Sequence, residues 1–385
     1  NVDPATCSPA ILERMNALAA KLYPNRVAPY TAIKAVKASL ELPLAKGLEY
    51  ETELANESKV TPESKGSIHA FFAERETRKV PDLPANVEAR PVKTAGVVGA
   101  GTMGGGIAIC FANASIPVTV LDASEDGLKR GIAGIDKTYE SMVKRGRITA
   151  DEKKQRMALI TPSLKYEDLG SADVIIEAVF EDMKLKQDVF RKLDAVAKPG
   201  AVLGTNTSTL DINEIAKVTK RPADVIGLHF FSPANVMRLV EIVRGKATSP
   251  AVIATAMNLA KVVKKVGVLA GNCPGFIGNR MMFPYMREAQ FLGEEGATPS
   301  QVDGALTAWG MAMGIYAVDD MGGLDVMERV KIELKEIFDV PGVRKPLVHE
   351  ILYKMGRLGQ KTGSGWYRYD ETRKPIADPE VEALI

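Results

Sequence analysis

The sequence has few cysteines, little net charge and no long apolar run. Its 385 residues include three cysteines, Cys7, Cys110 and Cys273, whose spacing matches neither a metal site nor a redox pair. We therefore expect no bound metal, and a reducing compartment. The formal net charge is only +2, which argues against nucleic acid as a partner. No apolar run reaches the length of a membrane-spanning helix, so we expect no membrane span.

The composition that remains is typical of a globular protein, with 46% hydrophobic and 25% charged residues. The length predicts two or more domains. Residues 8 to about 80 repeat apolar side chains at helical spacing, and Pro81, Pro84 and Pro91 then indicate a linker. The chain begins at Asn1 rather than Met, so we expect a piece of a longer protein.

From residue 93 onward, strand-like and helix-like segments alternate, which predicts a sheet with helices on both faces. After residue 270 strand signals are scarce until Gly365–Tyr369. We therefore predict an α/β protein. A Rossmann-type doubly wound parallel sheet spans 93–270, and an all-α C-terminal domain spans 271–370.

A glycine-rich loop follows the first predicted strand of this sheet. Gly99, Gly101 and Gly104 have the G-x-G-x-x-G spacing, and Asp122 ends the next strand, eighteen positions after Gly104. Such glycines let the backbone approach a pyrophosphate, and the acid accepts ribose hydroxyls. We predict NAD rather than NADP, because a carboxylate repels a 2′-phosphate and Arg130 lies too far along the chain to offset it. The alternative is a plain strand-end acid.

His229 and Glu241 are the candidate proton-transfer pair. His229 ends the apolar strand predicted over 225–229, and ligands of open α/β sheets bind beyond such strand ends. Glu241 lies inside another apolar strand, where a carboxylate needs a partner. An acid bonded to one ring nitrogen raises the basicity of the other. The alternatives are a histidine without catalytic function and an ion pair of Glu241 with Arg238 or Arg244.

Other polar residues support more than one interpretation. The run NTST at 206–209 follows a predicted strand and can hold a substrate oxygen or cap the next helix. Asn279 lies at the entrance to the helical domain and can reach the cleft or satisfy backbone groups. His69 and His349 are predicted to be surface or capping residues.

Together these motifs resemble the L-3-hydroxyacyl-CoA dehydrogenases of fatty-acid β-oxidation over about residues 93–370. The matching segments are GAGTMG (99–104), EAVFEDMKLK (177–186), NTSTL (206–210), HFFSPANVMRLVEIV (229–243), CPGFIGNR (273–280) and GRLGQKTGSGWYRY (356–369). The resemblance implies NAD-dependent oxidation of L-3-hydroxyacyl-CoA to 3-oxoacyl-CoA.

The two ends of the chain resemble parts of multifunctional β-oxidation enzymes. Residues 1–92, with HAFFAER at 69–75, resemble the tail and linker of an enoyl-CoA hydratase domain. Residues 371–385 resemble the segment that connects to a second helical copy. The hydratase core is absent, so the resemblance implies the dehydrogenase part of a hydratase/dehydrogenase without hydratase activity.

The resemblance also implies roles by position. His229 is the general base and Glu241 orients and charges it, while Ser208 and Asn279 hold the substrate oxygen and the histidine. The implied cofactor contacts are Gly99, Gly101, Thr102, Met103, Gly104, Asp122, Glu181, Lys186, Asn206, Ser208, Ser232 and Lys361. Coenzyme A would contact Thr138 and Lys144 or Arg145. No metal ligand is implied.

Two other functions stay open at this point. One is a different NAD-dependent β-hydroxyacid dehydrogenase, although these use a lysine where this chain has His229 and Glu241. The other is a catalytically silent scaffold that presents acyl-CoA to a hydratase or thiolase partner. A homodimer through the helical domain and an uncovered apolar face are alternatives for assembly. By default we expect the cytoplasm, with the peroxisome as the alternative.

Overall fold

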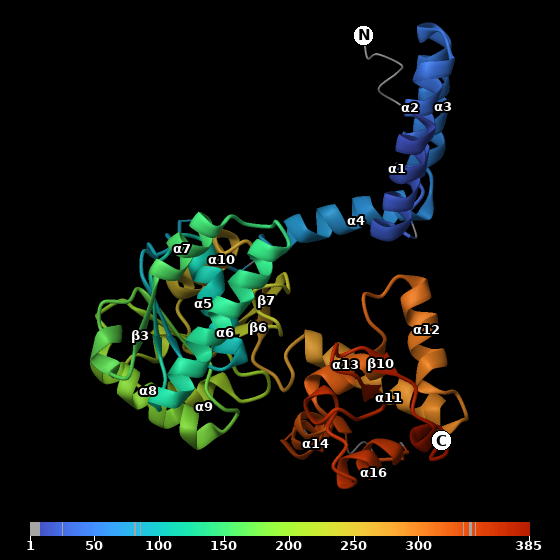
Figure 1. Cartoon of the computed structure of the whole chain (residues 1–385). Helices are drawn as coiled ribbons and strands as arrows, with labels where there is room; N and C mark the ends of the chain where they lie inside the picture. The colour runs from blue at the N-terminus through green and yellow to red at the C-terminus, as the bar shows by residue number, and fades with distance from the viewer. Residues whose placement is uncertain are drawn as a thin grey trace. The chain divides into compact units, whose positions relative to one another are not determined.

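The computed structural model describes residues 8–24, 26–80, 82–84, 86–333, 335–338, 341–342 and 344–385 (Figure 1). The predictions for Cys7 and Pro81 concern residues outside these ranges. The chain divides into two compact units. The first comprises Asn1–Glu76 with Asp303–Gly314, and the second comprises Thr77–Val302 with Ile315–Ile385.

Four helices form most of the first unit. They are α1 (Pro9–Leu22), α2 (Ala28–Glu41), α3 (Leu44–Lys59) and α4 (Pro62–Glu76). Each packs against the next in sequence, and Thr61 caps α4 by accepting the Ser64 N–H at 3.2 Å. Few apolar side chains of α1–α4 are buried, and Phe71 and Phe72 are both 56% exposed. The N-terminal helices are therefore present, as predicted, around a thin core.

An eight-stranded sheet forms the centre of the second unit, in the order β3-β2-β1-β4-β5-β6-β7-β8. The strands are β1 (Ala95–Val98), β2 (Val118–Leu121), β3 (Ile160–Ser163), β4 (Val174–Glu177), β5 (Val202–Thr205), β6 (Val225–Phe230), β7 (Leu239–Arg244) and β8 (Val266–Gly271). β1 to β6 are parallel, but β7 pairs antiparallel with β6, and β8 follows the direction of β7. The α/β fold is confirmed, although the sheet is not parallel throughout.

Helices cover both faces of this sheet, as a doubly wound fold requires. One apolar cluster joins the sheet to α5 (Thr102–Asn113), α6 (Glu125–Lys144) and α10 (Pro250–Val262). A second cluster, on the opposite face, joins it to α8 (Met183–Val196) and α9 (Ile212–Ala216). The short helix α7 (Ala150–Ala158) follows α6 and starts with a capping box. Strand residues alternate between the two clusters, because side chains alternate along a strand.

The C-terminal part of the chain is mostly helical, as predicted. Its elements are α11 (Gly278–Glu294), α12 (Pro299–Trp309), α13 (Ile315–Gly322), α14 (Leu324–Glu333), α15 (Lys335–Phe338), α16 (Val348–Lys354), the strand pair β9 (Arg368–Tyr369) and β10 (Pro375–Ile376), and α17 (Pro379–Glu382). Among the described residues, no helix is long and apolar enough to cross a membrane.

His349 corrects one prediction. It is fully buried in α16 rather than at the surface, with Nδ1 2.8 Å from Glu328 and Nε2 3.3 Å from Asp319. Burial alone would lower the pKa of His349, but the two carboxylates outweigh it and raise that pKa above its usual value. Asp319 also accepts the Trp366 indole N–H at 2.9 Å. A histidine that looks polar in sequence is therefore part of a buried polar cluster.

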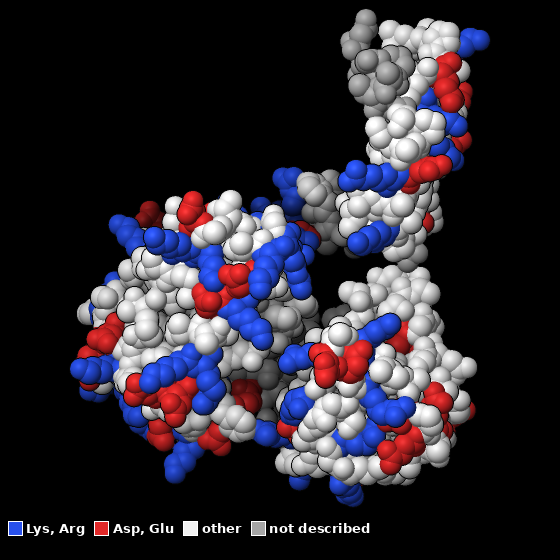
Figure 2. All heavy atoms as spheres, in the orientation of Figure 1, with Lys and Arg blue, Asp and Glu red and all other residues white. Residues whose placement is uncertain are grey.

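Charges of both signs are interspersed over the visible face of each unit in Figure 2, where Lys and Arg are blue and Asp and Glu red. This distribution fits the small net charge of +2.

Candidate active site

The antiparallel pairing of β6 and β7 brings His229 and Glu241 together. The two residues are register partners, so their side chains leave the same face of the sheet. His229 Nδ1 lies 2.7 Å from Glu241 Oε2. Nothing in the spacing of the two residues required this, because a parallel β7 would have offered a different partner. The reversal of β7 is therefore what assembles the pair.

Glu241 is also held by the first residues of the helical region. Its Oε1 accepts the backbone N–H groups of Ile277 at 2.9 Å and Gly278 at 2.7 Å, where α11 begins. A helix N-terminus favours a negative charge. Burial opposes ionisation of Glu241, but the hydrogen bonds from His229, Gly278 and Ile277 together hold its pKa below the usual range. Glu241 is therefore a carboxylate at neutral pH.

His229 lies in an enclosed aromatic setting. It is 5% exposed, and its ring centroid is 4.4 Å from that of Phe231 and 5.7 Å from that of Phe276. Because the Glu241 carboxylate only accepts hydrogen bonds, it assigns the proton to Nδ1. The lone pair is then on Nε2, which can accept a proton from a ligand.

The glycine loop and Asp122 border a second feature, a cavity of about 580 Å³. Asp122 Oδ2 accepts the Ala100 N–H at 2.9 Å, so the carboxylate is tied to the loop. Gly99 has φ +100°, and a Cβ at Gly104 would overlap the Gly99 carbonyl oxygen. The glycines are thus needed for the turn and for the close approach of α5. The lining residues are Ala100, Gly101, Thr102, Gly105, Gly106, Ile109, Asp122, Ser124, Gly127, Arg130, Gly131, Gly134, Ile135, Thr138, Pro233 and Asn235.

Arg130 lines this same cavity together with Asp122. Although Arg130 comes well after Asp122 in the sequence, it therefore borders the same cavity as that acid. α6 brings it back toward the loop, and Gly131 permits this because a Cβ there would overlap the Ala100 carbonyl oxygen. Asp122 directly follows β2 and is the charged residue that is hydrogen-bonded to the glycine loop, through the Ala100 N–H.

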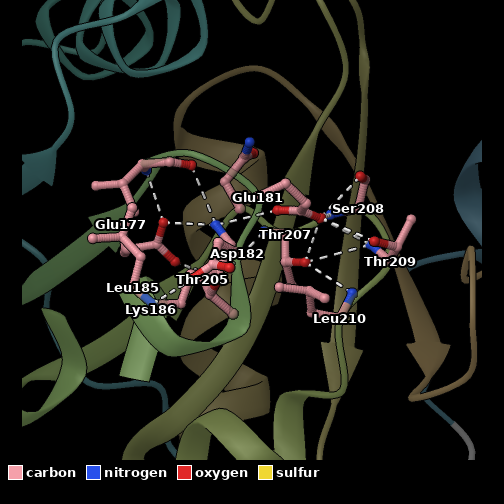
Figure 3. A network of polar contacts seen from close by, with 12 residues as sticks. Glu177, Glu181, Asp182, Leu185, Lys186, Thr205, Thr207, Ser208, Thr209 and Leu210 are labelled. Atoms are coloured by element: carbon pink, nitrogen blue, oxygen red, sulfur yellow. Dashed lines mark hydrogen bonds and ion pairs between the residues drawn. The ribbon is translucent and has the colours of Figure 1, made fainter. Parts of the chain in front are cut away.

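A third cluster joins the ends of β4 and β5 (Figure 3). Glu181 Oε1 accepts the Thr207 hydroxyl at 2.6 Å, the Ser208 N–H at 2.7 Å and the Ser208 hydroxyl at 3.1 Å. It also accepts the N–H and the hydroxyl of Thr209, each at 3.2 Å. The proton of Ser208 is thus directed at Glu181, which leaves the hydroxyl oxygen to accept a hydrogen bond.

Lys186 lies deeper than its predicted role suggests. The side chain is 1% exposed, and its Nζ is 2.7 Å from Glu177 Oε1 and 3.2 Å from Glu181 Oε2. Burial favours a neutral Glu181, but Lys186 and the donors of the NTST run outweigh this and lower its pKa. The Lys186 ammonium therefore contacts the carboxylates of both Glu177 and Glu181. Glu177, which sequence reasoning missed, carried the same signal as Glu241, an acid within an apolar strand.

The remaining predicted residues are distributed more widely. Asn206 Oδ1 accepts the Phe230 N–H at 2.9 Å, which ties the NTST run to the residue after His229. Ser232 precedes Pro233 across a cis peptide bond, next to the cavity. The other positions are Met103 in the first turn of α5, Asn279 half-buried in the first turn of α11, Lys361 in an ion pair with Asp325, Thr138 on the cavity wall, and Lys144 and Arg145 exposed at the end of α6.

Within the described ranges, no group of three or more His, Cys, Asp or Glu side chains could hold a metal ion. Cys110 is buried in α5 and Cys273 is half-buried, and both are free thiols.

Comparison with known proteins places this geometry in a family. The model for the 3-hydroxyacyl-CoA dehydrogenase NAD-binding domain matches residues 94–273, and the model for the C-terminal domain of the same enzymes matches 275–369. The human peroxisomal bifunctional enzyme is 42% identical over 377 residues, which cover 93% of this chain and 51% of the relative. The chain thus spans about half the length of the curated relatives it matches.

Solved structures agree in fold and sequence. The (S)-3-hydroxybutyryl-CoA dehydrogenase PaaH1 of Ralstonia eutropha is 35% identical, with a TM-score of 0.68, over 73% of this chain and 100% of its own. The dehydrogenase part of a C. elegans multifunctional enzyme is 33% identical, with a TM-score of 0.61, over 83% of this chain and 74% of its own.

Proposed function

Because the chain belongs to the 3-hydroxyacyl-CoA dehydrogenase family, we propose that it catalyses the NAD-dependent oxidation of L-3-hydroxyacyl-CoA to 3-oxoacyl-CoA in fatty-acid β-oxidation. The observation that carries this proposal is the 2.7 Å contact between His229, near the end of β6, and Glu241 of β7. A neighbour named for 3-hydroxybutyryl-CoA supports the substrate class.

The residues around the glycine loop fit NAD. The N-terminus of α5 offers backbone N–H groups to a pyrophosphate, and Asp122 offers a carboxylate to ribose hydroxyls. The chemistry that NAD supplies when bound is acceptance of a hydride. Thr102 and Asp122 line the same cavity, which supports a single site for both groups. Thr138 also lines this cavity, which makes it accessible to a ligand, as the proposed contact with coenzyme A requires.

His229 acts as the base in this proposal. Its Nε2 takes the proton of the 3-hydroxyl group while the hydride leaves C3, and the ring becomes an imidazolium. The ionised Glu241 stabilises that charge across 2.7 Å in a buried setting. In the reverse direction Nε2 returns the proton to the alkoxide. Ser208 and Asn279 are proposed to hold the substrate oxygen.

Several wider statements belong to the same proposal. Residues 1–92 are a hydratase remnant and linker, 93–270 bind NAD, 271–370 complete the substrate site, and 371–385 connect to a further segment. The names of the curated relatives, which are peroxisomal enzymes, support the peroxisomal alternative for the location of this chain, and the cytoplasmic default is not confirmed. A hydratase or thiolase partner and a homodimer through the helical domain remain proposals.

The deciding experiment is acetoacetyl-CoA-dependent oxidation of NADH by the purified chain, with crotonyl-CoA hydration measured in parallel. We expect rapid NADH oxidation and no hydration. Bound NADH without turnover would refute the enzymatic proposal in favour of a silent scaffold. Hydration of crotonyl-CoA would refute the interpretation of residues 1–92 as a remnant.

A further inference from the structure

Two buried polar residues, Glu177 and Thr205, lie side by side on neighbouring strands, at the level of the sheet two residues before His229. Glu177 of β4 is the register partner of Thr205 of β5, and Thr205 is the partner of Gly227 of β6. His229 follows Gly227 by two residues, so it leaves the same face of the sheet. Neither Glu177 nor Thr205 has any exposed surface. Both therefore lie beneath the proposed site, out of reach of a ligand.

The carboxylate of Glu177 divides its two oxygens between neighbouring elements. Oε2 accepts the Thr205 hydroxyl at 2.7 Å. Oε1 accepts the Lys186 ammonium at 2.7 Å and the Val179 N–H at 2.7 Å. A wholly buried carboxylate is tolerated only with such donors. Thr205 thus fixes one side of Glu177, and the other side fixes Lys186.

Lys186 links Glu177 to Glu181 (Figure 3). Its Nζ lies 3.2 Å from Glu181 Oε2, while Oε1 of the same carboxylate holds the NTST run. The carboxylates of Glu177 and Glu181 therefore share the Lys186 ammonium. Glu177 is the more buried of the two, and it sets the position of the ammonium. The Thr205 oxygen also accepts the Thr207 N–H at 3.2 Å, so Thr205 supports this run from below as well.

We propose that Glu177 and Thr205 are positioning residues for the cofactor, which act through Lys186 to hold the Glu181 carboxylate at the cofactor site. This inference rests on the proposed function, together with the cofactor contact that the family resemblance implies for Glu181. Glu177 and Thr205 touch neither cofactor nor substrate. Their effect is to fix the direction in which Glu181 and the Ser208 hydroxyl face the ligand.

The sharpest test compares two substitutions at Thr205. Thr205→Val keeps the shape but removes the hydroxyl, so Glu177 Oε2 loses its donor. Thr205→Ser keeps the hydroxyl and removes a buried methyl group. NADH binding is measured by titration of NADH fluorescence, with thermal unfolding beside it. We expect Thr205→Val to raise the Kd for NADH about fivefold, which is what the loss of one net hydrogen bond of about 1 kcal/mol gives. Thr205→Ser should stay within about twofold.

Glu177→Gln provides an independent test with a matched control. The control is Asp173→Asn, which breaks the 2.7 Å ion pair with Lys198 just before the opposite end of β4. We expect Glu177→Gln to raise the Kd for NADH about tenfold, since Lys186 then loses its buried charged partner and is drawn toward Glu181, its remaining carboxylate. Asp173→Asn should lower the unfolding temperature and leave the Kd within about twofold.

Equal Kd values for NADH in Thr205→Val and Thr205→Ser would overturn the proposal. They would mean that the hydroxyl group at position 205 has no effect on cofactor binding. A Kd rise for Asp173→Asn as large as that for Glu177→Gln would do the same. If Glu177→Gln does not fold, the Thr205 pair still decides. The readout is binding of NADH, so failure of wild-type turnover with acetoacetyl-CoA would refute the proposed oxidation without deciding this inference.

Discussion

The substitution Glu241→Gln tests the central geometry of the site most directly. Glu241 accepts three hydrogen bonds with two oxygens, one from His229 and two from the N–H groups of Ile277 and Gly278. A glutamine has one oxygen, and its amide nitrogen only donates. If the oxygen faces the two N–H groups, the amide nitrogen faces Nδ1 of His229 and donates to it.

This arrangement would move the ring proton of His229 from Nδ1 to Nε2. A histidine protonated on Nε2 cannot take a proton there, and no anion remains to stabilise an imidazolium. General-base catalysis contributes about 10²- to 10⁴-fold, so we expect kcat to fall by about that factor, or by about 3–5 kcal/mol in activation free energy. The fold should persist, because the two backbone N–H groups keep an acceptor.

The assay is acetoacetyl-CoA-dependent NADH oxidation, with the Kd for NADH measured separately. The Kd should stay within about twofold of wild type, because Glu241 does not line the cavity beside the glycine loop. Turnover of Glu241→Gln within about threefold of wild type would refute the reasoning, since it would mean that neither the tautomer nor the anion matters. A large rise in the Kd alone would place Glu241 in cofactor binding instead.

The remaining predictions concern stability and packing. The pKa of Glu328 is lowered to about 2 and that of His349 is raised, so the charged pair stabilises the fold above pH 4.5 and below pH 6.5. Unfolding followed by tryptophan fluorescence should show stability falling on both sides of that window, and His349→Gln should abolish the loss on the alkaline side. Gly104→Ala should raise the Kd for NADH at least about tenfold, since its Cβ overlaps the loop backbone. An unchanged Kd for Gly104→Ala would contradict the packing argument. Gly66→Ala in α4, where nothing lies within 4 Å of the added Cβ, should instead raise the free energy of unfolding by about 0.5–1 kcal/mol.

Local pattern predicted the strands and the glycine loop well, because both depend on short-range physics. Val118–Leu121 is a strand with the predicted bounds, and α11 continues through Pro284 as expected. The direction of β7 could not be read in this way. Its sequence is apolar in either direction, and only the partner strand and the chain reversal after Phe230 determine which residue meets His229.

The polar residues show the same limit. The resemblance implies that Lys186 contacts the cofactor, and the sequence does not reveal that two carboxylates of its own unit surround this buried side chain. His349 lies in a polar helical segment, which predicts a surface or capping residue, but the acids that compensate its burial lie elsewhere in the sequence. Composition and spacing indicate which groups need partners. The identity of a partner is set by tertiary packing, which one sequence does not contain.

The donors of Glu241 have a consequence for the modularity of this architecture. The match to the NAD-binding family model ends at residue 273, whereas Ile277 and Gly278 belong to the C-terminal match. A recombinant fragment cut at that boundary would keep the glycine loop. It would lose two of the three hydrogen-bond donors that hold the Glu241 carboxylate. Swapping the helical half between homologues therefore also exchanges two of the donors that hold Glu241 in place beside His229. The two halves are separable as sequence segments but share a single chemical unit.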